Sequence, residues 1–518
     1  MNNLLQPVYP DLPADGLPPC RPPADAADYL TDESRLQGQA DRVYFPRSET
    51  EILSLLRAAN DSRTPLTIAG GRTGITGGSV PLSGWLASLE GMRQFTGLRR
   101  GQNDTWLLRC QPGVTLSAIN EALAARDFPG AEWSAEDQQA LKDFRSAPPC
   151  WFPPDPTEQT ACLGGMAACN ASGARTLFFG PTRSHIAGLR VALADGSILP
   201  LRRGECRAAP DGAFRLADHR GGEHAGRIPD YVMPAVKNAA GYYSAPDMDL
   251  LDLFIGAEGT LGVFTEIEII LQSAPEALLG AVAFFPDEAQ AVGFVQAARQ
   301  ADLASGRLLA LEFFDAQALN LLRAQKTSQG DSSHIPAMET CAELLLELLE
   351  TGGSDAETAW TAMDESESRR LKDFRHALPE TVNQRIGERA ARYPGLTKLG
   401  TDFAVPDQAL PAMLQAYHSA LREGQFEYVI FGHIGNNHVH VNILPRDLDE
   451  YRRGKQLYLQ LARTALDLGG TVSAEHGVGK LKTALLREMY GEAGIAAMLA
   501  VKRLFDPNGI INPGNMFD

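Results

Sequence analysis

Four of the ten histidines lie close together near the C-terminal end of the sequence: His433, His438, His440 and His476. In the run FGHIGNNHVHVN, the alternation over 438–442 predicts a strand that presents His438, His440 and Asn442 on one face. A turn at 435–437 would fold His433 back toward His440. A lone histidine in a strand is usually an ordinary core or surface residue, but this clustering favours a site over that alternative.

Imidazole and carboxylate side chains together point to metal chemistry. Two neutral imidazoles plus one carboxylate form a catalytic metal set with open positions, which suits zinc or manganese. The carboxylate candidate is Glu475, which precedes His476 in the glycine-flanked run GTVSAEHGVGK. The residues therefore predict a divalent-metal site built from two separate parts of the chain.

A glycine cluster, AGGRTGITGG at 69–78, follows a predicted strand. Five of the nine residues from Gly70 to Gly78 are glycine. Backbone N–H groups without side chains can converge on a phosphate. The spacing matches neither GxGxxG nor a P-loop, and a flexible loop or a set of tight turns is the alternative.

A second cluster contains PDPT at 154–157 and LGGMAACNASG at 163–173. Its side chains are small and almost all uncharged, so a flat ligand could lie directly against the backbone. A tight helix crossing is the alternative. Two such clusters about 90 residues apart favour a long, phosphate-bearing cofactor.

Predicted helices and strands, which alternate along the sequence, must position the histidine and glycine clusters. The N-terminal half predicts an α+β unit that ends near Ser273, with helices at 46–60 and 117–126 and strands at 65–69, 106–110, 189–194, 253–255 and 262–271. The segments 130–150 and 202–229 resemble insertions, the first around a short helix. From residue 279 the pattern predicts an antiparallel sheet covered by helices, with strands at 280–285, 307–314, 396–404, 427–431 and 438–444 and helices at 287–301, 316–324, 407–423 and 447–468. A further helix is predicted at 484–504.

The composition narrows the function classes. The 518 residues include 47 Lys and Arg against 64 Asp and Glu, a net charge of −17. This charge repels phosphate backbones and so disfavours nucleic-acid binding, although a small anion could bind in a local basic pocket. The seven cysteines form no CxxC pair, which disfavours zinc ribbons and iron–sulfur clusters. With no bilayer-spanning apolar run and no leader signature, we expect a soluble, cytoplasmic protein without a transmembrane segment.

Three segments resemble the FAD-binding domain of the PCMH/vanillyl-alcohol oxidase superfamily: AGGRTGITGG, PPDPTEQTACLGGMAACNASGARTLFFGPTRSHIAGLRVALADGS and KNAAGYYSAPDMDLLDLFIGAEGTLGVFTEIEIIL. Within it, the resemblance is to the branch of glycolate oxidase flavoprotein subunits, D-lactate dehydrogenases and D-2-hydroxyglutarate dehydrogenases. It implies that the first cluster cradles the FAD pyrophosphate and the second wraps the flavin. The implied FAD contacts are Gly70, Gly71, Arg72, Thr73, Gly74, Gly77, Gly78, Asp155, Thr157, Gly164, Gly165, Asn170 and Gly173.

The same resemblance implies how the cofactor and the domains are arranged. Members that bind flavin covalently through this loop carry histidine where Arg72 stands, so non-covalent FAD is implied here. The implied fold is α+β, with a PCMH-type FAD-binding domain of two α+β subdomains at 1–275. A ferredoxin-like antiparallel-sheet substrate (cap) domain follows at 276–465, and a C-terminal segment at 466–518 returns to the FAD domain.

The family motifs GHxGDGNxHxN and EHGxGxxK also match in register. They imply metal ligands at His433, His440 and Glu475, a substrate contact at Asn442, and a catalytic base that also contacts substrate at His476. The family's Asp-Gly-Asn is replaced here by Asn436-Asn437-His438. Asn437 can adopt the left-handed backbone of the missing glycine. The resemblance leaves open whether His438 joins the metal ligands or alters substrate choice.

Two cationic residues are implied as substrate anchors. The segment FRHALPETVN resembles the family's carboxylate-binding helix and indicates Arg375, and Lys398 stands in TKLGTDFAVP where a family lysine faces substrate. An arginine can hold a carboxylate through two parallel hydrogen bonds. A solvated helix face is the alternative for each residue.

The resemblance implies oxidation of a small D-2-hydroxy acid anion, of the D-lactate, glycolate or D-2-hydroxyglutarate type, to the 2-oxo acid by hydride transfer to flavin N5. A separate electron acceptor is implied: a quinone, a cytochrome, an electron-transfer flavoprotein or an iron–sulfur protein. Peripheral attachment at the inner membrane and a homodimer are left open. The alternatives are a sugar or alcohol oxidase that uses oxygen, a His/Glu metal hydrolase with a nucleotide-binding module, and a binding protein that holds FAD structurally.

Overall fold

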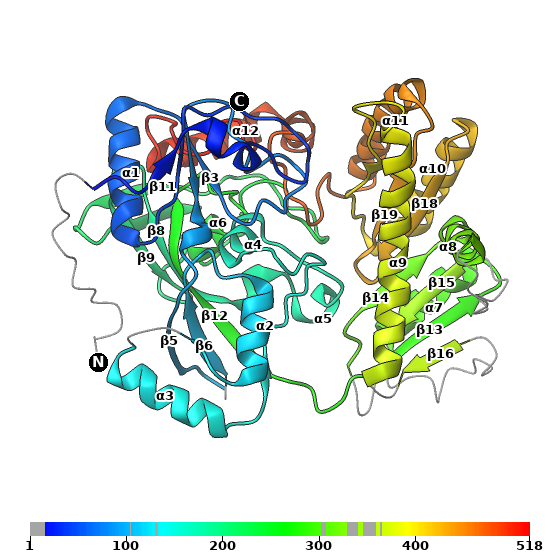
Figure 1. Ribbon diagram of the computed structural model, residues 1–518, viewed down its shortest axis with the longest axis horizontal. Helices are drawn as coiled ribbons and strands as arrows, with labels where there is room; N and C mark the ends of the chain where they lie inside the picture. The colour runs from blue at the N-terminus through cyan, green and yellow to red at the C-terminus, as the bar shows by residue number, and fades with distance from the viewer. Residues whose placement is uncertain are drawn as a thin grey trace.

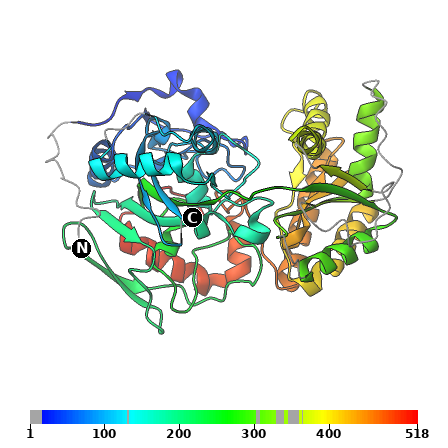
Figure 2. The same cartoon turned by 90° about the horizontal axis from the view of Figure 1, so that it is seen from below.

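The computed structural model describes residues 16–103, 105–129, 133–301, 307–328, 340–344, 359–362 and 365–517. They form two lobes, and the chain crosses between the lobes after β12 and again after α11 (Figures 1 and 2). Residues 1–15 and part of the acidic region at 350–368 lie outside the described residues. No helix in the described ranges is both long and apolar enough to cross a membrane.

The first lobe contains two principal sheets. A four-stranded sheet has the order β1-β2-β4-β3, with bounds Cys20–Arg21, Arg42–Tyr44, Trp85–Ser88 and Leu66–Ala69. A six-stranded antiparallel sheet has the order β5-β6-β12-β8-β9, with β7 paired to the end of β12. Its bounds are Phe95–Arg100, Trp106–Cys110, Val263–Ser273, Ile186–Ala192, Ile198–Arg202 and, for β7, Cys150–Trp151. A separate hairpin, β10 (Ala213–Ala217) and β11 (Glu223–Arg227), occupies the predicted insertion at 202–229.

The helices of this lobe begin where capping residues allow. Ser48 accepts a hydrogen bond from the Glu51 N–H and starts α1 (Glu49–Ser62), and Thr115 starts α2 in the same way. The remaining bounds are α2 Leu116–Ala125, α3 Ala135–Ser146, α4 Leu163–Cys169, α5 Thr176–Phe179 and α6 Leu251–Phe254. The predicted strand at 253–255 is wrong, because this segment lies in and just after α6. A short, fully buried apolar run fits a helix turn as well as a strand.

The second lobe is one antiparallel sheet covered by helices, as the sequence predicts. Its strand order is β16-β13-β15-β14-β18-β19-β17, wider than a β-α-β-β-α-β unit because the unpredicted β15 and β16 add to it. The strands are β13 Gly280–Phe285, β14 Leu311–Phe314, β15 Thr340–Leu344, β16 Ala359–Ala362, β17 Leu399–Gly400, β18 Tyr428–His433 and β19 His438–Ile443. The helices are α7 Glu288–Gln300, α8 Ala316–Ser328, α9 Glu365–Ala390, α10 Leu410–Glu423 and α11 Leu448–Asp467.

The β18–β19 hairpin is the element that positions the histidines. In its register His433 lies opposite His438, and Phe431 lies opposite His440. A single 3₁₀ turn at Ile434–Asn436 connects the strands, and Asn437 has φ +53°. The predicted turn and the left-handed Asn437 are therefore both confirmed.

The C-terminal segment packs against the first lobe. After α12 (Thr483–Phe505), Ile511 forms a parallel bridge with Leu66 at the start of β3. The N–H of Asn512 donates to the carbonyl of Leu66 (2.9 Å), and the N–H of Ile68 donates to Oδ1 of Asn512 (2.7 Å). The strand that leads into the first glycine cluster is therefore supported by the last residues of the chain.

Candidate metal and flavin site between the lobes

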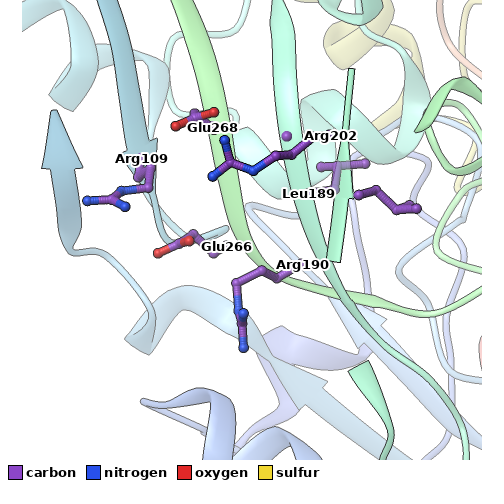
Figure 3. Close-up of a pocket in the computed structure, with 8 residues that line it drawn as sticks. Arg109, Leu189, Arg190, Arg202, Glu266 and Glu268 are labelled. Atoms are coloured by element: carbon purple, nitrogen blue, oxygen red, sulfur yellow. The ribbon is translucent and has the colours of Figure 1, made fainter. Parts of the chain in front are cut away.

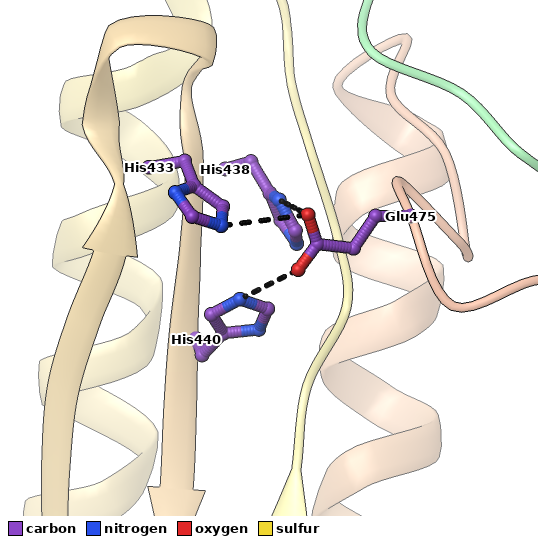
Figure 4. A group of neighbouring side chains, drawn as sticks. All are labelled: His433, His438, His440 and Glu475. Atoms are coloured by element: carbon purple, nitrogen blue, oxygen red, sulfur yellow. Dashed lines mark ion pairs between the residues drawn. The ribbon is translucent and has the colours of Figure 1, made fainter. Parts of the chain in front are cut away.

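Three histidines and one glutamate meet where the lobes join. His433, His438 and His440 extend from the β18–β19 hairpin toward Glu475, which stands on a loop from the C-terminal segment (Figure 4). One ligand atom from each residue lies within 4.8 Å of the other three. Nε2 of His433 and Nε2 of His440 lie 3.4 and 3.3 Å from the Glu475 carboxylate, and Nδ1 of His438 lies 3.8 Å from it. The donor set of imidazole nitrogens and a carboxylate fits a divalent transition metal.

The opposite nitrogen of each ring contacts a group outside this set. Nδ1 of His433 contacts Glu312, and Nδ1 of His440 lies 2.9 Å from the carbonyl oxygen of Thr401. Nε2 of His438 lies 3.1 Å from Oδ1 of Asp402. Metal-binding histidines are commonly oriented in this way, by a carboxylate or carbonyl on the far nitrogen.

Positively charged and acidic side chains alternate along the contacts from Lys237 through Glu475 and His433 to Glu312. Burial alone would raise the pKa of Glu475, but Lys237 and His433 hold it well below its usual range, with Nζ of Lys237 2.6 Å from Oε2. Burial disfavours charge on His433, yet the Glu312 carboxylate raises the pKa of His433 to about 9. Although burial opposes it, Arg375 and His433 lower the pKa of Glu312 to about 2. Burial and the adjacent His440 ring keep the pKa of His438 well below its usual range.

Asp402 is a buried carboxylate that organises the loop carrying Glu475. It accepts hydrogen bonds from the backbone N–H groups of Glu475 and His476, both at 3.1 Å, and from Nζ of Lys482 at 2.7 Å. Burial disfavours its charge, but His476 and Lys482 hold the pKa of Asp402 well below its usual range. Only 1% of the Asp402 side chain is exposed, so its charge depends on these partners.

His476 stands on the open side of the cluster. Its ring stacks on His440 with centroids 5.4 Å apart, and 28% of its side chain is exposed, against 0% for His438. Nδ1 lies 3.4 Å from Oδ2 of Asp402, and Nε2 lies 3.4 Å from Oε1 of Glu475. Unlike His438, His476 can therefore be reached from solvent while a carboxylate orients it.

Of the three residues predicted to bind substrate, Arg375 adjoins the histidine cluster, whereas Asn442 and Lys398 lie at or near the β17–β19 pair. Nε of Arg375 lies 3.5 Å from Oε2 of Glu312, so Arg375 adjoins the histidine cluster through that carboxylate. Asn442 is buried on β19, in register with Gly400. Lys398 precedes β17, where burial and the charge of Arg35 lower its pKa.

The two glycine clusters touch each other in the first lobe. The N–H of Gly71 donates to Sγ of Cys162 (3.2 Å), the residue that caps α4. A Cβ on Gly70 would collide with the same sulfur, so only glycine permits this approach. A Cβ on Gly74 would meet no atom within 4 Å, so the backbone of the loop around Gly74 is accessible to a ligand's phosphates. This narrow, side-chain-free backbone fits the FAD that the sequence predicts.

The remaining predicted FAD contacts surround this junction. Thr73, Gly77 and Gly78 lie in the first loop, and Gly164 and Gly165 lie in the first turn of α4. Asn170 ends α4 with φ +50°, Gly173 packs against Asp155, and Thr157 is exposed. Arg72 points elsewhere: its guanidinium lies 4.2 Å from the Tyr29 ring and 3.9 Å from a Glu90 oxygen.

A second carboxylate fixes the Glu475 loop from the flavin side. The backbone N–H groups of Val478 and Gly479 donate to Glu258 at 2.6 and 2.7 Å. Gly479 has φ +51°, and a Cβ there would collide with the carbonyl oxygen of Thr76 in the first glycine loop. The loop that holds Glu475 and His476 is thus in direct contact with the predicted FAD cradle.

A hollow over the six-stranded sheet lies apart from this chemistry. It is lined by alternating basic and acidic side chains, including Arg109, Arg190, Arg202, Glu266 and Glu268 (Figure 3). Arg109 pairs with Asp137 at 2.7 Å, and Glu268 pairs with Arg99 at 2.6 Å. These charges form a structural ion-pair network on the sheet.

Three charged residues of the site, Glu312, Lys237 and Asp402, were not predicted from the sequence. Glu312 is the one charge in the apolar strand segment LALEFF, an interruption that could have marked it. Lys237 begins the KNAAGYY run, and Asp402 is the one acidic residue in KLGTDFAV. Nothing local in the sequence reveals their partners: Glu312 contacts His433 across two neighbouring strands, and Lys237 and Asp402 contact Glu475 from distant parts of the chain.

Two known protein families match this chain, one in each lobe. The FAD binding domain family matches residues 40–142 and 139–202, and the FAD linked oxidases, C-terminal domain family matches 274–516. A probable mitochondrial D-lactate dehydrogenase of Danio rerio is 31% identical, covering 92% of this chain and 84% of that protein. A D-2-hydroxyglutarate dehydrogenase of Stutzerimonas stutzeri (strain A1501) is 30% identical (92% and 90%), and glycolate oxidase subunit GlcD of Bacillus subtilis (strain 168) is 27% identical (93% and 90%).

A solved structure shares the fold. Alkyldihydroxyacetonephosphate synthase superposes with a TM-score of 0.60 at 15% identity, over 92% of this chain and 77% of that one. The two-lobed α+β fold with matched FAD domains defines an FAD-dependent oxidoreductase that acts on CH–OH groups. More particularly, the chain belongs to the FAD-linked oxidases of the PCMH/vanillyl-alcohol oxidase superfamily, in the branch that contains the D-lactate, glycolate and D-2-hydroxyglutarate enzymes.

Asp402→Asn is expected to lower the free energy of unfolding by about 3–5 kcal/mol, because Lys482 would keep a buried charge without its counter-ion. Urea unfolding followed by tryptophan fluorescence measures the change. Glu223→Gln is the matched control: it removes the carboxylate of an exposed pair with Arg215 and should cost about 0–1 kcal/mol. Equal unfolding midpoints for the two variants would contradict the buried-charge argument.

Proposed function

We propose that the protein oxidises a small D-2-hydroxy acid to the 2-oxo acid, with FAD bound non-covalently and Zn²⁺ or Mn²⁺ held by His433, His440 and Glu475. One observation carries the proposal: an unbroken chain of side-chain contacts, from Arg375 through Glu312 and His433 to Glu475. The proposed carboxylate anchor and the proposed metal-ligand set thus adjoin each other, as oxidation at the carbon next to a carboxylate requires, and Lys237 of the first lobe contacts Glu475.

His476 is proposed as the base that takes the hydroxyl proton. Its ring is partly exposed, and the Asp402 carboxylate lies 3.4 Å from Nδ1, where it can hold the ring proton. Nε2, which lies 3.4 Å from Glu475, is then the nitrogen proposed to accept the hydroxyl proton. A divalent metal, when bound, supplies positive charge that lowers the pKa of the substrate hydroxyl. The α-hydrogen leaves with two electrons as the proton moves to His476, so the alcohol carbon becomes the carbonyl carbon.

Arg375, Lys398 and Asn442 are proposed to hold the substrate. Arg375 adjoins the metal-ligand set, and its planar guanidinium can bind a carboxylate through two parallel hydrogen bonds. Because the protein's net charge is −17, these local cations must supply the attraction for an anionic substrate.

FAD, when bound, supplies the acceptor for the hydride, at N5 of the flavin. The residues proposed to hold it are the glycine-loop and second-cluster contacts named above. A separate quinone, cytochrome, electron-transfer flavoprotein or iron–sulfur protein is proposed to take the electrons onward.

The proposal is tested by mixing the FAD-loaded enzyme anaerobically with glycolate, D-lactate, D-2-hydroxyglutarate and D-malate. At least one should bleach the visible flavin absorbance rapidly, because hydride transfer reduces the flavin. L-lactate and a simple sugar serve as controls for chirality and for the superfamily's other substrates. Bleaching by the sugar alone would overturn the hydroxy-acid proposal.

His476→Asn is expected to slow flavin reduction by about 10²–10⁴-fold, the usual contribution of a general base. Bound FAD should remain, because His476 lies in the substrate half of the site. Stopped-flow absorbance gives the rate, and His418→Asn is the control, since His418 contacts Tyr428 and Glu288 outside the site. An unchanged reduction rate would remove His476 from the mechanism.

Treatment with a strong chelator, followed by desalting, is expected to abolish turnover while the flavin stays bound. Adding Zn²⁺ or Mn²⁺ should restore activity, because the hydroxyl would again be polarised. Metal content by mass spectrometry and flavin content by absorbance are measured on the same samples. Full turnover in a sample shown to contain no metal would remove the metal from the proposal.

A further inference from the structure

His438 is a buried histidine that the family motif does not contain. The motif has asparagine at this position, so the imidazole is a property of this chain. The residue is 0% exposed, and within the described part of the chain neither ring nitrogen has a well-aligned hydrogen bond, although Nε2 lies at ion-pair distance from Asp402. A buried polar atom left unpaired costs about 1–3 kcal/mol, and a metal ion bound at Nδ1 would remove that cost.

Of the two ring nitrogens, Nδ1 points into the proposed metal-ligand set. Nδ1 of His438 lies 3.8 Å from Oε2 of Glu475, and the His438 ring lies 4.3 Å from that of His440 and 5.7 Å from that of His433, centroid to centroid. The three rings and the carboxylate converge on one point (Figure 4). The neighbours of Nδ1 are thus metal-ligating groups.

The opposite ring nitrogen of His438, Nε2, faces a carboxylate, which is the usual partner of the far nitrogen in a metal-binding histidine. Nε2 lies 3.1 Å from Asp402 Oδ1, and Asp402 is itself held by Lys482 and by Ser473, whose hydroxyl donates to it at 2.7 Å. Placing the ring proton on Nε2 leaves the Nδ1 lone pair for a metal. His433 and His440 share this arrangement through Glu312 and the Thr401 carbonyl.

We propose that His438 is an additional metal ligand, so that this chain binds its metal through three imidazoles and one carboxylate. The inference rests on the metal site of the proposed function and deepens it. A donor set richer in imidazole favours Zn²⁺ over Mn²⁺, because Mn²⁺ prefers oxygen ligands. The substitution of asparagine by histidine would thereby shift the metal preference of the site.

The test is X-ray absorption at the zinc edge of the FAD-loaded enzyme reconstituted with Zn²⁺, which counts the imidazoles bound to the metal. Three are expected for the wild-type protein, two for His438→Asn and His438→Gln, and three for the control His418→Asn. Competition with a chelator should show Zn²⁺ affinity falling by about tenfold or more in the two His438 variants. Mn²⁺ affinity should fall less.

The wild-type count decides the inference even where a variant fails to fold. Two imidazoles in the wild-type protein would overturn the role of His438 and leave the proposed hydroxy-acid oxidation intact. A wild-type enzyme that bleaches with a hydroxy acid yet binds no Zn²⁺ would overturn both the inference and the metal, but not the dehydrogenase activity. Flavin that no hydroxy acid bleaches, in an enzyme with three imidazoles on zinc, would overturn the proposed function alone.

Discussion

Two buried carboxylates, one from each lobe, hold the loop that carries Glu475 and His476. Asp402 binds the backbone of Glu475 and His476 from the second lobe, and Glu258 binds the backbone of Val478 and Gly479 from the first. A hydrogen bond to a charged group is worth about 1.5–3 kcal/mol, and four of them act within the five consecutive residues 475–479. The geometry of the site therefore depends on both lobes at once.

Asp402 also contacts two histidines of the site. The same carboxylate contacts Nε2 of His438 and Nδ1 of His476, so the group that orients the buried imidazole also orients the exposed one. Around it, cations and anions alternate from Arg375 to Lys237. This arrangement places positive charge locally in a protein of net charge −17, where an anionic substrate would otherwise be repelled.

The sequence predicted those parts of the structure that local pattern determines. Capping at Ser48, the strand from 106 to 110 and the turn before Asn437 follow from residue type and periodicity, and they are confirmed. The strand at 253–255 failed because an apolar run of that length has no distinguishing period. Glu312, Asp402 and Lys237 were missed for a different reason: each is defined by a partner from a distant segment, and no spacing in the sequence records that pairing.

The support of β3 by the final residues has a consequence for how the protein is made. Leu66, which introduces the first glycine loop, bonds to Ile510 and Asn512, and Lys480 bonds through its N–H to Thr76 within that loop. These partners leave the ribosome more than four hundred residues later, after the whole second lobe has been synthesised. The first glycine loop is consequently synthesised well before the residues that complete its hydrogen bonds.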